Sequence, residues 1–176
     1  DAQLSIDDID SINLNNISII HFGSATGFLP GPLQAAYLHL LQKALHHNIF
    51  ISFDPNYRHL LFKNNTDSFV SQSWHFLSNC NFFKVSDEEA MLLTNTQTLE
   101  AATTVLLDET KGVFAITLGK DGTLLGFNGQ QFIIPSIPVK PVDTTGAGDA
   151  FVGAVLYQLS KLDPATFNEL SLEMWS

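Results

Sequence analysis

The chain has 176 residues, long enough for one domain with a hydrophobic core, and 45% of them are hydrophobic, so we expect a globular protein. Its formal net charge is −10, from 18 acidic and 8 basic side chains, which argues against nucleic acid and anionic membrane surfaces as partners. A single cysteine, Cys80, excludes an internal disulfide and is typical of a reducing compartment, so we expect a cytoplasmic protein.

Predicted strands and helices alternate along most of the chain. Ser5 and Asp8 form a capping-box pattern that predicts a short helix. Mainly apolar runs predict strands, and apolar residues at helical spacing predict helices, in this order: strand 17–23, helix 31–47, strand 49–53, helix 67–77, strand 82–85, a helix from Ser86, helix 99–108 and strand 113–118. The first strand is predicted to be buried on both faces, as in a parallel sheet. No apolar run approaches the roughly 18 residues that would cross a bilayer.

The last part of the chain is predicted to add an antiparallel hairpin and two helices. Residues 124–127 and 131–134 flank an Asn-Gly pair, which is typical of tight hairpin turns. The apolar stretch 150–162 predicts one helix, and a second is predicted from about Pro164. The sequence therefore predicts an α/β fold with three layers, α/β/α. In it, a mostly parallel sheet with an antiparallel edge hairpin lies between helices, in one domain over residues 1–176.

The stretch DTTGAGDAF, at residues 143–151, places two glycines directly before a predicted helix. Gly146 and Gly148 allow backbone conformations closed to other residues and leave no side chain in the way of a ligand. Backbone N–H groups there and in the first helical turn would form a concave site suited to phosphate or a developing oxyanion. Asp149 at its edge would repel a bound anion, but it suits the removal of a proton from a hydroxyl that attacks a phosphoryl group.

Two other interpretations of this stretch remain open. An aspartate at a helix start is a common N-cap, and glycine pairs are common in loops. A dinucleotide-binding fingerprint, G-x-G-x-x-G, would indicate an oxidoreductase, but its third glycine position is Phe151 here. The residues before it include Pro138 and Pro141, which make a poor central strand, and no GxxxxGK[ST] phosphate loop occurs in the chain.

Polar residues follow the predicted strands at the end where ligands collect in open α/β sheets. Asp54, Asn56 and Arg58 come directly after strand 49–53. A guanidinium there could neutralise a transferring phosphate, although Asp-Pro-Asn is also ordinary turn chemistry. In the same way, Glu89 lies in the first turn of a predicted helix, where an acidic residue is also explained by capping.

The stretch at residues 143–151 resembles the C-terminal signature of the ribokinase/phosphofructokinase-B (PfkB) family of sugar kinases. Further similarities follow the family's order: D-x-N-x-R at 54–58, an N-x-x-E element with Ser86 in place of Asn, and T-x-G-x-x-G at 117–122. Fructokinase-like members resemble this chain in the Ser86 replacement. The resemblance covers roughly Phe22 to Phe151 and implies a ribokinase-like fold. A hairpin turn without a ligand remains the alternative for 117–122.

The resemblance also implies roles for these positions. Asp149 would be the base that receives the hydroxyl proton, and the N–H groups of Gly146, Ala147, Gly148 and Asp149 would stabilise the transferring phosphoryl group. The other positions are assigned by ligand: Lys84, Thr117, Gly119 and Gly122 to ATP; Asp54, Asn56 and Arg58 to the sugar or the transferred phosphate; Glu89 to Mg²⁺ through water; and Asp143 with the Thr145 carbonyl to a monovalent cation such as K⁺.

The implied function is ATP-dependent phosphorylation of a sugar hydroxyl, most simply that of fructose. The second candidate substrate is 2-keto-3-deoxygluconate, because Arg58 could pair with its carboxylate. The alternative from another class is a nucleotide-binding relative without catalysis, which would have no need of Asp149 beside the anion site. Family members are longer at both ends, so we expect a fragment that lacks the N-terminal part and is inactive or nearly so alone. Its exposed sheet edge is expected to pair with another copy, which would give a homo-oligomer.

Overall fold

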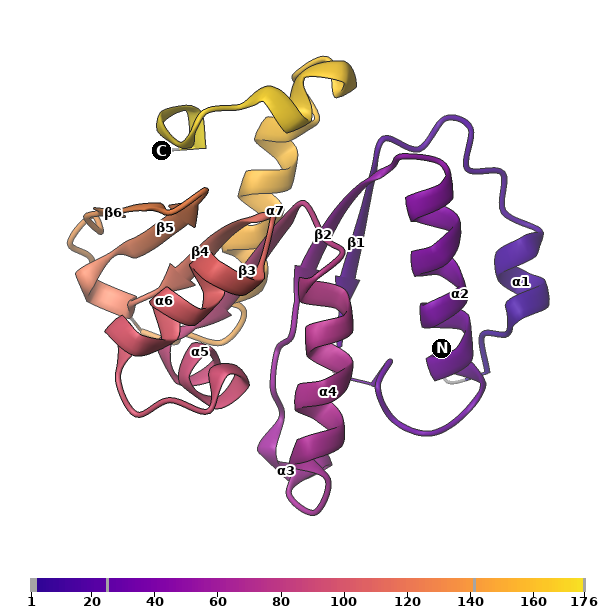
Figure 1. Cartoon of the computed structure of the whole chain (residues 1–176), viewed down its shortest axis with the longest axis horizontal. Coiled ribbons are helices and arrows are strands. Elements are labelled where there is room, and N and C mark those ends of the chain that lie inside the picture. The colour runs from indigo at the N-terminus through magenta and orange to yellow at the C-terminus, as the bar shows by residue number, and fades with distance from the viewer. Residues whose placement is uncertain (1–2, 25, 141, 176) are drawn as a thin grey trace.

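One six-stranded sheet organises the protein, and the structure, a computed structural model, describes residues 3–24, 26–140 and 142–175 (Figure 1). The strands lie side by side in chain order: β1 Ile19–Gly23, β2 Phe50–Asp54, β3 Phe82–Ser86, β4 Val113–Thr117, β5 Thr123–Phe127 and β6 Gln130–Ile134. Strands β1 to β4 are parallel, and β5 and β6 continue the sheet as an antiparallel hairpin. The predicted mostly parallel sheet with an antiparallel edge hairpin is confirmed.

Helices connect the strands and pack on the sheet. They are α1 Ile6–Asp10, α2 Pro32–His46, α3 His59–Phe62, α4 Thr66–Leu77, α5 Asp87–Thr94, α6 Leu99–Glu109 and α7 Ala147–Leu159, with 3-10 helices η1 Gly119–Asp121, η2 Pro164–Glu169 and η3 Leu172–Trp175. The short helix α3 was not predicted. The segment from Pro164 is a 3-10 helix and not an α-helix, since Thr166 N–H bonds to the Asp163 carbonyl three residues earlier.

The two faces of the sheet carry separate apolar cores, which confirms the three layers. On one face, side chains of α2, α4, α5 and α6 pack on the sheet around buried phenylalanines such as Phe53 and Phe76, whose rings stack at 5.1 Å. On the other face, α7, η2 and η3 cover Phe50 and Phe82, and Trp175 stacks on Phe82 at 5.1 Å. Each fully buried phenylalanine contributes roughly 1.5–3 kcal/mol, so both layers stabilise the sheet.

Strand β1 differs from its prediction as a strand buried on both faces. It lies at the edge of the described sheet, with Phe22 fully buried and His21 exposed. The central strand β2 is buried along its whole length, as predicted. The difference lies on the α7 face of β1, where His21 is exposed and Ile19 is only partly buried, whereas Phe22 is buried in the opposite core.

The carboxyl ends of the four parallel strands meet at one edge of the sheet. Gly23 is level with Asp54, and Ser86 is level with Thr117. Ser52 pairs with Phe82, so Asp54 and Lys84 are also level on neighbouring strands. The residues predicted to bind ligands therefore come from adjacent strand ends, as expected for a parallel sheet.

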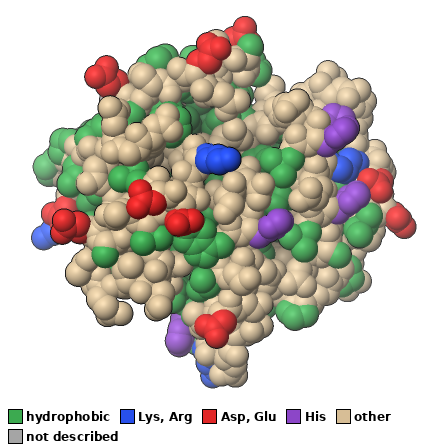
Figure 2. Space-filling view, in the orientation of Figure 1, with side chains coloured by type: hydrophobic (Ala, Val, Ile, Leu, Met, Phe, Trp, Pro, Cys, Tyr) green, Lys and Arg blue, Asp and Glu red, His purple; other side chains and the backbone are tan. Residues whose placement is uncertain are grey.

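Several smaller expectations have clear outcomes. The capping box of Ser5 and Asp8 is confirmed, and Cys80 is buried. Helix α4 begins one residue before its predicted start, and its N-cap, Asn65, makes no side-chain capping bond. Among the described residues, no helix is both long enough and apolar enough to cross a membrane. On the face drawn in Figure 2, Lys and Arg side chains lie apart from one another, in keeping with the net charge of −10.

Candidate functional site

The site is centred on the first turn of α7. Gly146 is its N-cap and has a φ of 78°, a left-handed conformation that glycine adopts without strain. The Ala147 N–H donates to the Thr144 carbonyl at 3.1 Å, so this predicted anion donor is engaged in the turn. Helix geometry leaves the N–H groups of Gly148 and Asp149 without an acceptor in the helix. These two N–H groups, with the positive end of the helix dipole, form the core of a site for an anion.

Asp149 is the third residue of α7 and its side chain is exposed. Its carboxylate makes no hydrogen bond or ion pair with any residue that the structure describes. Helix α7 has no side-chain capping bond, so Asp149 does not act as the N-cap. The capping alternative is therefore wrong for Asp149. An open carboxylate beside free N–H groups can accept a proton from an incoming hydroxyl.

A buried ammonium lies against the same helix start. The Lys84 side chain points to the α7 face of β3 and is only 9% exposed. A methyl group added at Gly148 would lie 2.9 Å from Lys84 Nζ, so the glycine leaves space for the ammonium. The Asp54 carboxylate lies 3.3 Å from Nζ and balances part of the charge. Lys84 thus adds a fixed positive charge below the two N–H groups of α7.

Asp54 points into the protein and is almost fully buried. Burial raises the pKa of its carboxyl to about 6; the charge of Lys84 lowers this pKa and the charge of Glu89 raises it. Its Oδ1 accepts a hydrogen bond from the Asn56 N–H at 3.0 Å, which holds Asn56 in a left-handed conformation with a φ of 45°. Asp54 is therefore placed to hold Lys84 and the following turn, and is not open to solvent.

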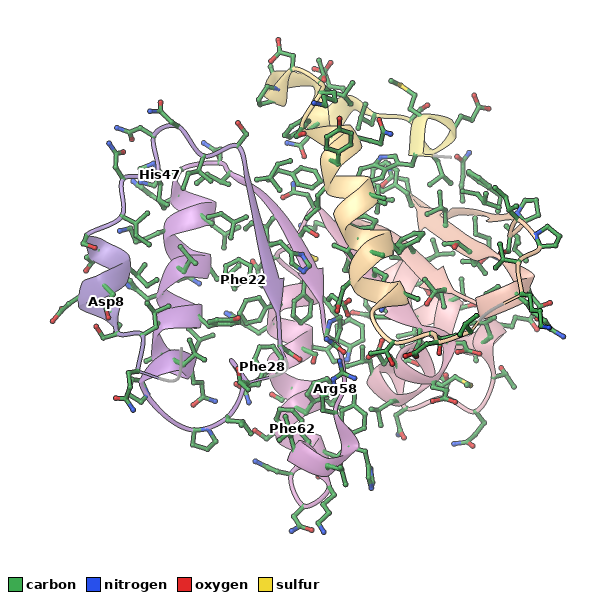
Figure 3. The ribbon with its side chains drawn as sticks, turned by 180° about the vertical axis from the view of Figure 1, so that it is seen from behind. Asp8, Phe22, Phe28, His47, Arg58 and Phe62 are labelled. Carbon is green, nitrogen blue, oxygen red and sulfur yellow. The ribbon has the colours of Figure 1, made fainter. Side chains whose placement is uncertain are left out.

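Arg58 is exposed just past the end of β2, at the start of α3 (Figure 3). It makes no ion pair with the part of the chain that the structure describes. The turn before it is held in place by Ser24, whose N–H bonds to the Asp54 carbonyl at 3.2 Å and whose hydroxyl donates to the Pro55 carbonyl. Arg58 therefore presents a free guanidinium on an anchored turn.

Glu89 joins two loops. Its Oε2 accepts the Ser86 N–H at 2.8 Å in a complete capping box, as the capping interpretation required. Its Oε1 accepts the Tyr57 N–H at 2.7 Å, which ties α5 to the turn after β2. The described residues contain no cluster of three or more His, Cys, Asp or Glu side chains arranged to hold a metal ion. Each carboxylate oxygen of Glu89 thus already accepts one backbone N–H.

Thr117 ends β4, Gly119 begins the 3-10 helix η1, and Gly122 follows that helix before β5. The Thr117 hydroxyl donates to the Val85 carbonyl at 3.4 Å. Gly122 has a φ of 106°, and a methyl group there would lie 2.1 Å from the Ile134 carbonyl oxygen. This turn packs on the end of β6, which is a structural reason for glycine at position 122 independent of any ligand.

Asp143 and Thr145 lie in the exposed segment before α7. Asp143 Oδ1 accepts the Thr145 N–H at 2.8 Å, and this hydrogen bond holds the pKa of Asp143 below its usual value. The Thr145 side chain and the Thr144 backbone also interact with this carboxylate. The Asp143 carboxylate and the Thr145 carbonyl are oxygen ligands of the type that hard cations prefer.

Sequence reasoning missed His21, which lies on β1. The Nδ1 atom of its ring is 3.1 Å from Ser52 Oγ, and the charge of Asp149 acts on its ring. The one available signal was a polar residue inside the apolar run 17–23. In a strand, alternation places that residue on the face opposite Phe22, which is the α7 face.

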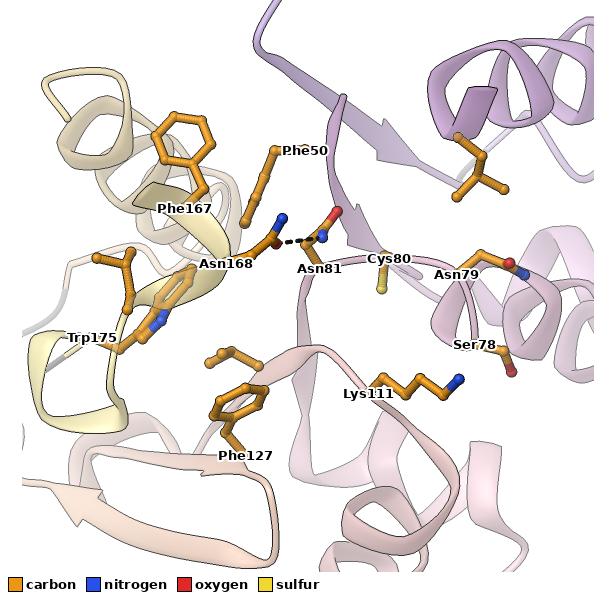
Figure 4. Close-up of a pocket in the computed structure, with 13 residues that line it drawn as sticks. Phe50, Ser78, Asn79, Cys80, Asn81, Lys111, Phe127, Phe167, Asn168 and Trp175 are labelled. Atoms are coloured by element: carbon orange, nitrogen blue, oxygen red, sulfur yellow. Dashed lines mark hydrogen bonds between the residues drawn. The ribbon is translucent and has the colours of Figure 1, made fainter. Parts of the chain in front are cut away.

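Two hollows in the protein lie apart from the predicted site residues. One, of about 560 Å³, runs between α7 and β5 from Thr123 and Phe151 to Trp175 and has mainly apolar walls. The other, of about 370 Å³, lies at the opposite edge of the sheet, where Asn81 Nδ2 donates to Asn168 Oδ1 at 2.9 Å (Figure 4). Neither is lined by a predicted site residue.

Comparisons with known proteins point to one family. Residues 2–173 match the pfkB family carbohydrate kinase profile. Fructokinase-1 of Zea mays is 29% identical over 170 residues, which are 96% of this chain and 52% of the relative. Fructokinase-2 of Oryza sativa subsp. japonica is 30% identical over 174 residues, 98% of this chain and 49% of the relative. The chain thus spans about half the length of the curated relatives it matches.

Solved structures give the same picture. Fructokinase from Vibrio cholerae O395, in its fructose, ADP and calcium ion bound form, has a TM-score of 0.83 and 29% identity, over 96% of this chain and 55% of that one. Aminoimidazole riboside kinase from Salmonella enterica, complexed with aminoimidazole riboside and an ATP analog, has a TM-score of 0.82 and 30% identity, over 96% of this chain and 57% of that one. Because the family profile spans almost the whole sequence, this chain belongs to the pfkB family of carbohydrate kinases.

Proposed function

We propose that the whole protein transfers the γ-phosphoryl group of ATP to a hydroxyl of a sugar, and that fructose is this sugar. The observation that carries the proposal is the open Asp149 carboxylate beside the free N–H groups of α7 and the buried Lys84 ammonium. A protein that only binds anions gains nothing from a carboxylate at that point, because it repels the ligand. A phosphotransferase needs both a base and fixed positive charge.

In the proposed reaction, Asp149 accepts the hydroxyl proton as the sugar oxygen attacks the γ-phosphorus and the bond to the β-phosphate oxygen breaks. The N–H groups of Gly148 and Asp149 stabilise negative charge on the transferring group, and Lys84 adds its ammonium charge. One such donor is worth about 2.7–4 kcal/mol of transition-state stabilisation. Arg58, which has no ion-pair partner among the described residues, would neutralise charge on the sugar side.

ATP is the second substrate in this proposal, with Mg²⁺ and a monovalent cation such as K⁺ as cofactors. Bound Mg²⁺ would reduce the charge on the phosphates. Glu89 fits a contact through water, because each of its oxygens already accepts one N–H and keeps a further lone pair. Asp143 Oδ2 and the Thr145 carbonyl fit a monovalent cation before α7. Thr117, Gly119 and Gly122 would border the nucleotide through their backbone.

Fructose is favoured because the curated relatives named above are fructokinases and a similar solved structure contains fructose. A second candidate, 2-keto-3-deoxygluconate, is favoured by the free guanidinium of Arg58, which could pair with the substrate carboxylate. The non-catalytic alternative is a relative that binds nucleotide without turnover. Turnover with fructose, turnover with 2-keto-3-deoxygluconate, or turnover with neither distinguishes these three candidate functions.

The test is phosphorylation by the whole protein with ATP and a panel of sugars, followed by ADP release. We expect turnover with fructose and little with 2-keto-3-deoxygluconate or nucleosides. The 176-residue chain alone should show almost no turnover, since it spans only about half the length of its relatives. ATP binding by the whole protein without turnover on any sugar would contradict the kinase proposal.

A further inference from the structure

Ser24 is a fully buried serine that directly follows β1, at the edge of the sheet where the candidate site lies. Its N–H donates to the Asp54 carbonyl at 3.2 Å, and its hydroxyl donates to the Pro55 carbonyl. The last pair in the register of β1 and β2 is Gly23 with Asp54, and Pro55 has no N–H with which to extend it. Ser24 therefore continues the contact between the two strands by one residue, through its side chain.

The Pro55 carbonyl depends on that hydroxyl. Pro55 is buried, and the Ser24 hydroxyl is the donor that its carbonyl has among the described residues. A buried carbonyl without a hydrogen bond is unfavourable, so the backbone at Pro55 should move when the hydroxyl is removed. The side chain of Ser24 thus fixes the start of the turn that leads from β2 to α3.

The rest of this turn is held by hydrogen bonds, so a shift at Pro55 is passed on to Arg58. The N–H groups of the two residues after Pro55 donate to the carboxylates of Asp54 and Glu89, at 3.0 and 2.7 Å. Arg58 comes next, as the N-cap of α3, and its exposed side chain makes no ion pair with a described residue. The backbone of the turn therefore sets where the guanidinium lies.

Helix α2 holds the strand end that carries Ser24. The Tyr37 hydroxyl donates to the Gly23 carbonyl at 3.0 Å, and the Tyr37 ring packs edge-on against Phe22 with centroids 5.6 Å apart. A methyl group at Gly27 would overlap the same ring, so glycine lets the chain after Ser24 pass close to it. The position of Ser24 is thus fixed by α2 as well as by β2.

We propose that Ser24 is a positioning residue for Arg58: its hydroxyl holds the turn that presents the guanidinium to the sugar or to the transferring phosphoryl group. This inference rests on the proposed kinase function, in which Arg58 neutralises charge on the sugar side. Because Ser24 is fully buried, it acts without touching a substrate. Removing its hydroxyl should therefore impair the reaction through Arg58 and leave ATP binding unaffected.

The first test is a double-mutant cycle in the whole protein, with fructose and ATP as substrates. We expect Ser24→Ala to lower kcat/KM for fructose by about tenfold, with KM for ATP unchanged within about twofold. In an Arg58→Ala background, the same substitution should change kcat/KM by less than about twofold, because the guanidinium that Ser24 positions is absent. A general loss of folded protein would instead be equal in both backgrounds. Equal losses in both backgrounds, or no loss in the wild type, would overturn the proposal.

Ser73→Ala is the matched control for this cycle. Ser73 is also fully buried, but it lies on α4 and its hydroxyl has no hydrogen-bond partner among the described residues, so kcat/KM for fructose should not change. If Ser24→Ala does not fold, Tyr37→Phe takes its place, because it removes the donor to the Gly23 carbonyl and keeps the ring. A loss that disappears in the Arg58→Ala background supports the proposal. No loss, or the same loss in both backgrounds, overturns it.

The second test measures the turn without catalysis, by amide hydrogen exchange in the whole protein. Ser24→Ala should speed the exchange of the Asn56 and Tyr57 N–H groups by about fivefold or more, because the turn that holds them is loosened. Ser73→Ala should leave both rates unchanged. Unchanged exchange in Ser24→Ala would overturn the proposal.

The two tests separate failure of this inference from failure of the proposed function. If the whole protein phosphorylates no sugar, the kinase proposal fails, and hydrogen exchange still decides whether Ser24 holds the turn. If the protein phosphorylates fructose and Ser24→Ala has the same effect with and without Arg58, only the role of Ser24 is wrong.

Discussion

At the scale of single residues, Asp149 carries the strongest prediction. Asp149→Asn keeps the shape of an exposed side chain that has no partner among the described residues, so stability should change little. Removing a general base should lower kcat by about 10²–10⁴-fold while ATP binding persists. Steady-state kinetics and calorimetric ATP titration of the whole protein measure the two effects. Asp108→Asn, on the exposed surface of α6, is the matched control. A variant at Asp149 with wild-type turnover would remove the base assignment.

Gly148 gives a second prediction at this scale. A methyl group at position 148 would displace Lys84 Nζ, which is the mobile end of a long side chain, so the helix should tolerate the change. We expect Gly148→Ala to leave the melting temperature nearly unchanged but to weaken ATP binding, because the ammonium moves from the helix start.

Gly153→Ala is the control for Gly148→Ala on the same helix. An added methyl group there meets nothing within 4 Å, so α7 should gain up to about 1 kcal/mol with no change in ATP affinity. Equal ATP affinities for the two variants would show that the position of Lys84 has no influence on ATP binding.

Asp54 gives a prediction of pH dependence. Burial raises its pKa to about 6 from 3.8, so between these values the folded protein holds a proton that the unfolded chain has released. The contribution of Asp54 to the free energy of unfolding therefore falls as pH rises from about 4 to about 6, by roughly 3 kcal/mol. Urea unfolding of the wild type and Asp54→Asn across this range measures the difference. A difference that is constant with pH would contradict the prediction.

At the scale of elements, two turn glycines should differ in their contribution to stability: Gly122 between β4 and β5, and Gly129 between β5 and β6. Gly122→Ala should cost more than about 2 kcal/mol, because its φ of 106° is closed to alanine and the methyl group would meet the Ile134 carbonyl at 2.1 Å. Gly129→Ala has a φ of 73° but open space around it, so it should cost only about 1–2 kcal/mol. Urea unfolding distinguishes them, and equal losses would show that contact with β6 is unimportant.

The elements were the most predictable part of this protein. Mainly apolar runs located all four parallel strands, and the Asn-Gly pair located the hairpin, because these patterns act over a few neighbouring residues. The edge position of β1 could not be predicted, since an apolar run looks alike whether one or two strands flank it. The family resemblance made Asp149 and Lys84 candidates, but the closeness of Lys84 to Gly148 depends on packing between β3 and α7, which are far apart in sequence.

At the scale of the whole molecule, the open edge of β1 predicts self-association. In the described part of the chain, β1 pairs only with β2, so its outer N–H and C=O groups are available to another strand. We expect sedimentation velocity of the 176-residue chain to show larger species as concentration rises. A strict monomer at every concentration would contradict edge pairing.

The two hydrogen bonds of Glu89 have a consequence for how the proposed substrates influence each other. One carboxylate holds the start of α5 and the Tyr57 backbone beside Arg58, so a displacement on one side is transmitted to the other. We therefore expect sugar and nucleotide to bind with synergy, each increasing the affinity of the whole protein for the other by the same factor. Glu89→Gln keeps the size of the side chain but weakens these two hydrogen bonds. The factor by which each substrate raises the affinity for the other should therefore fall toward one.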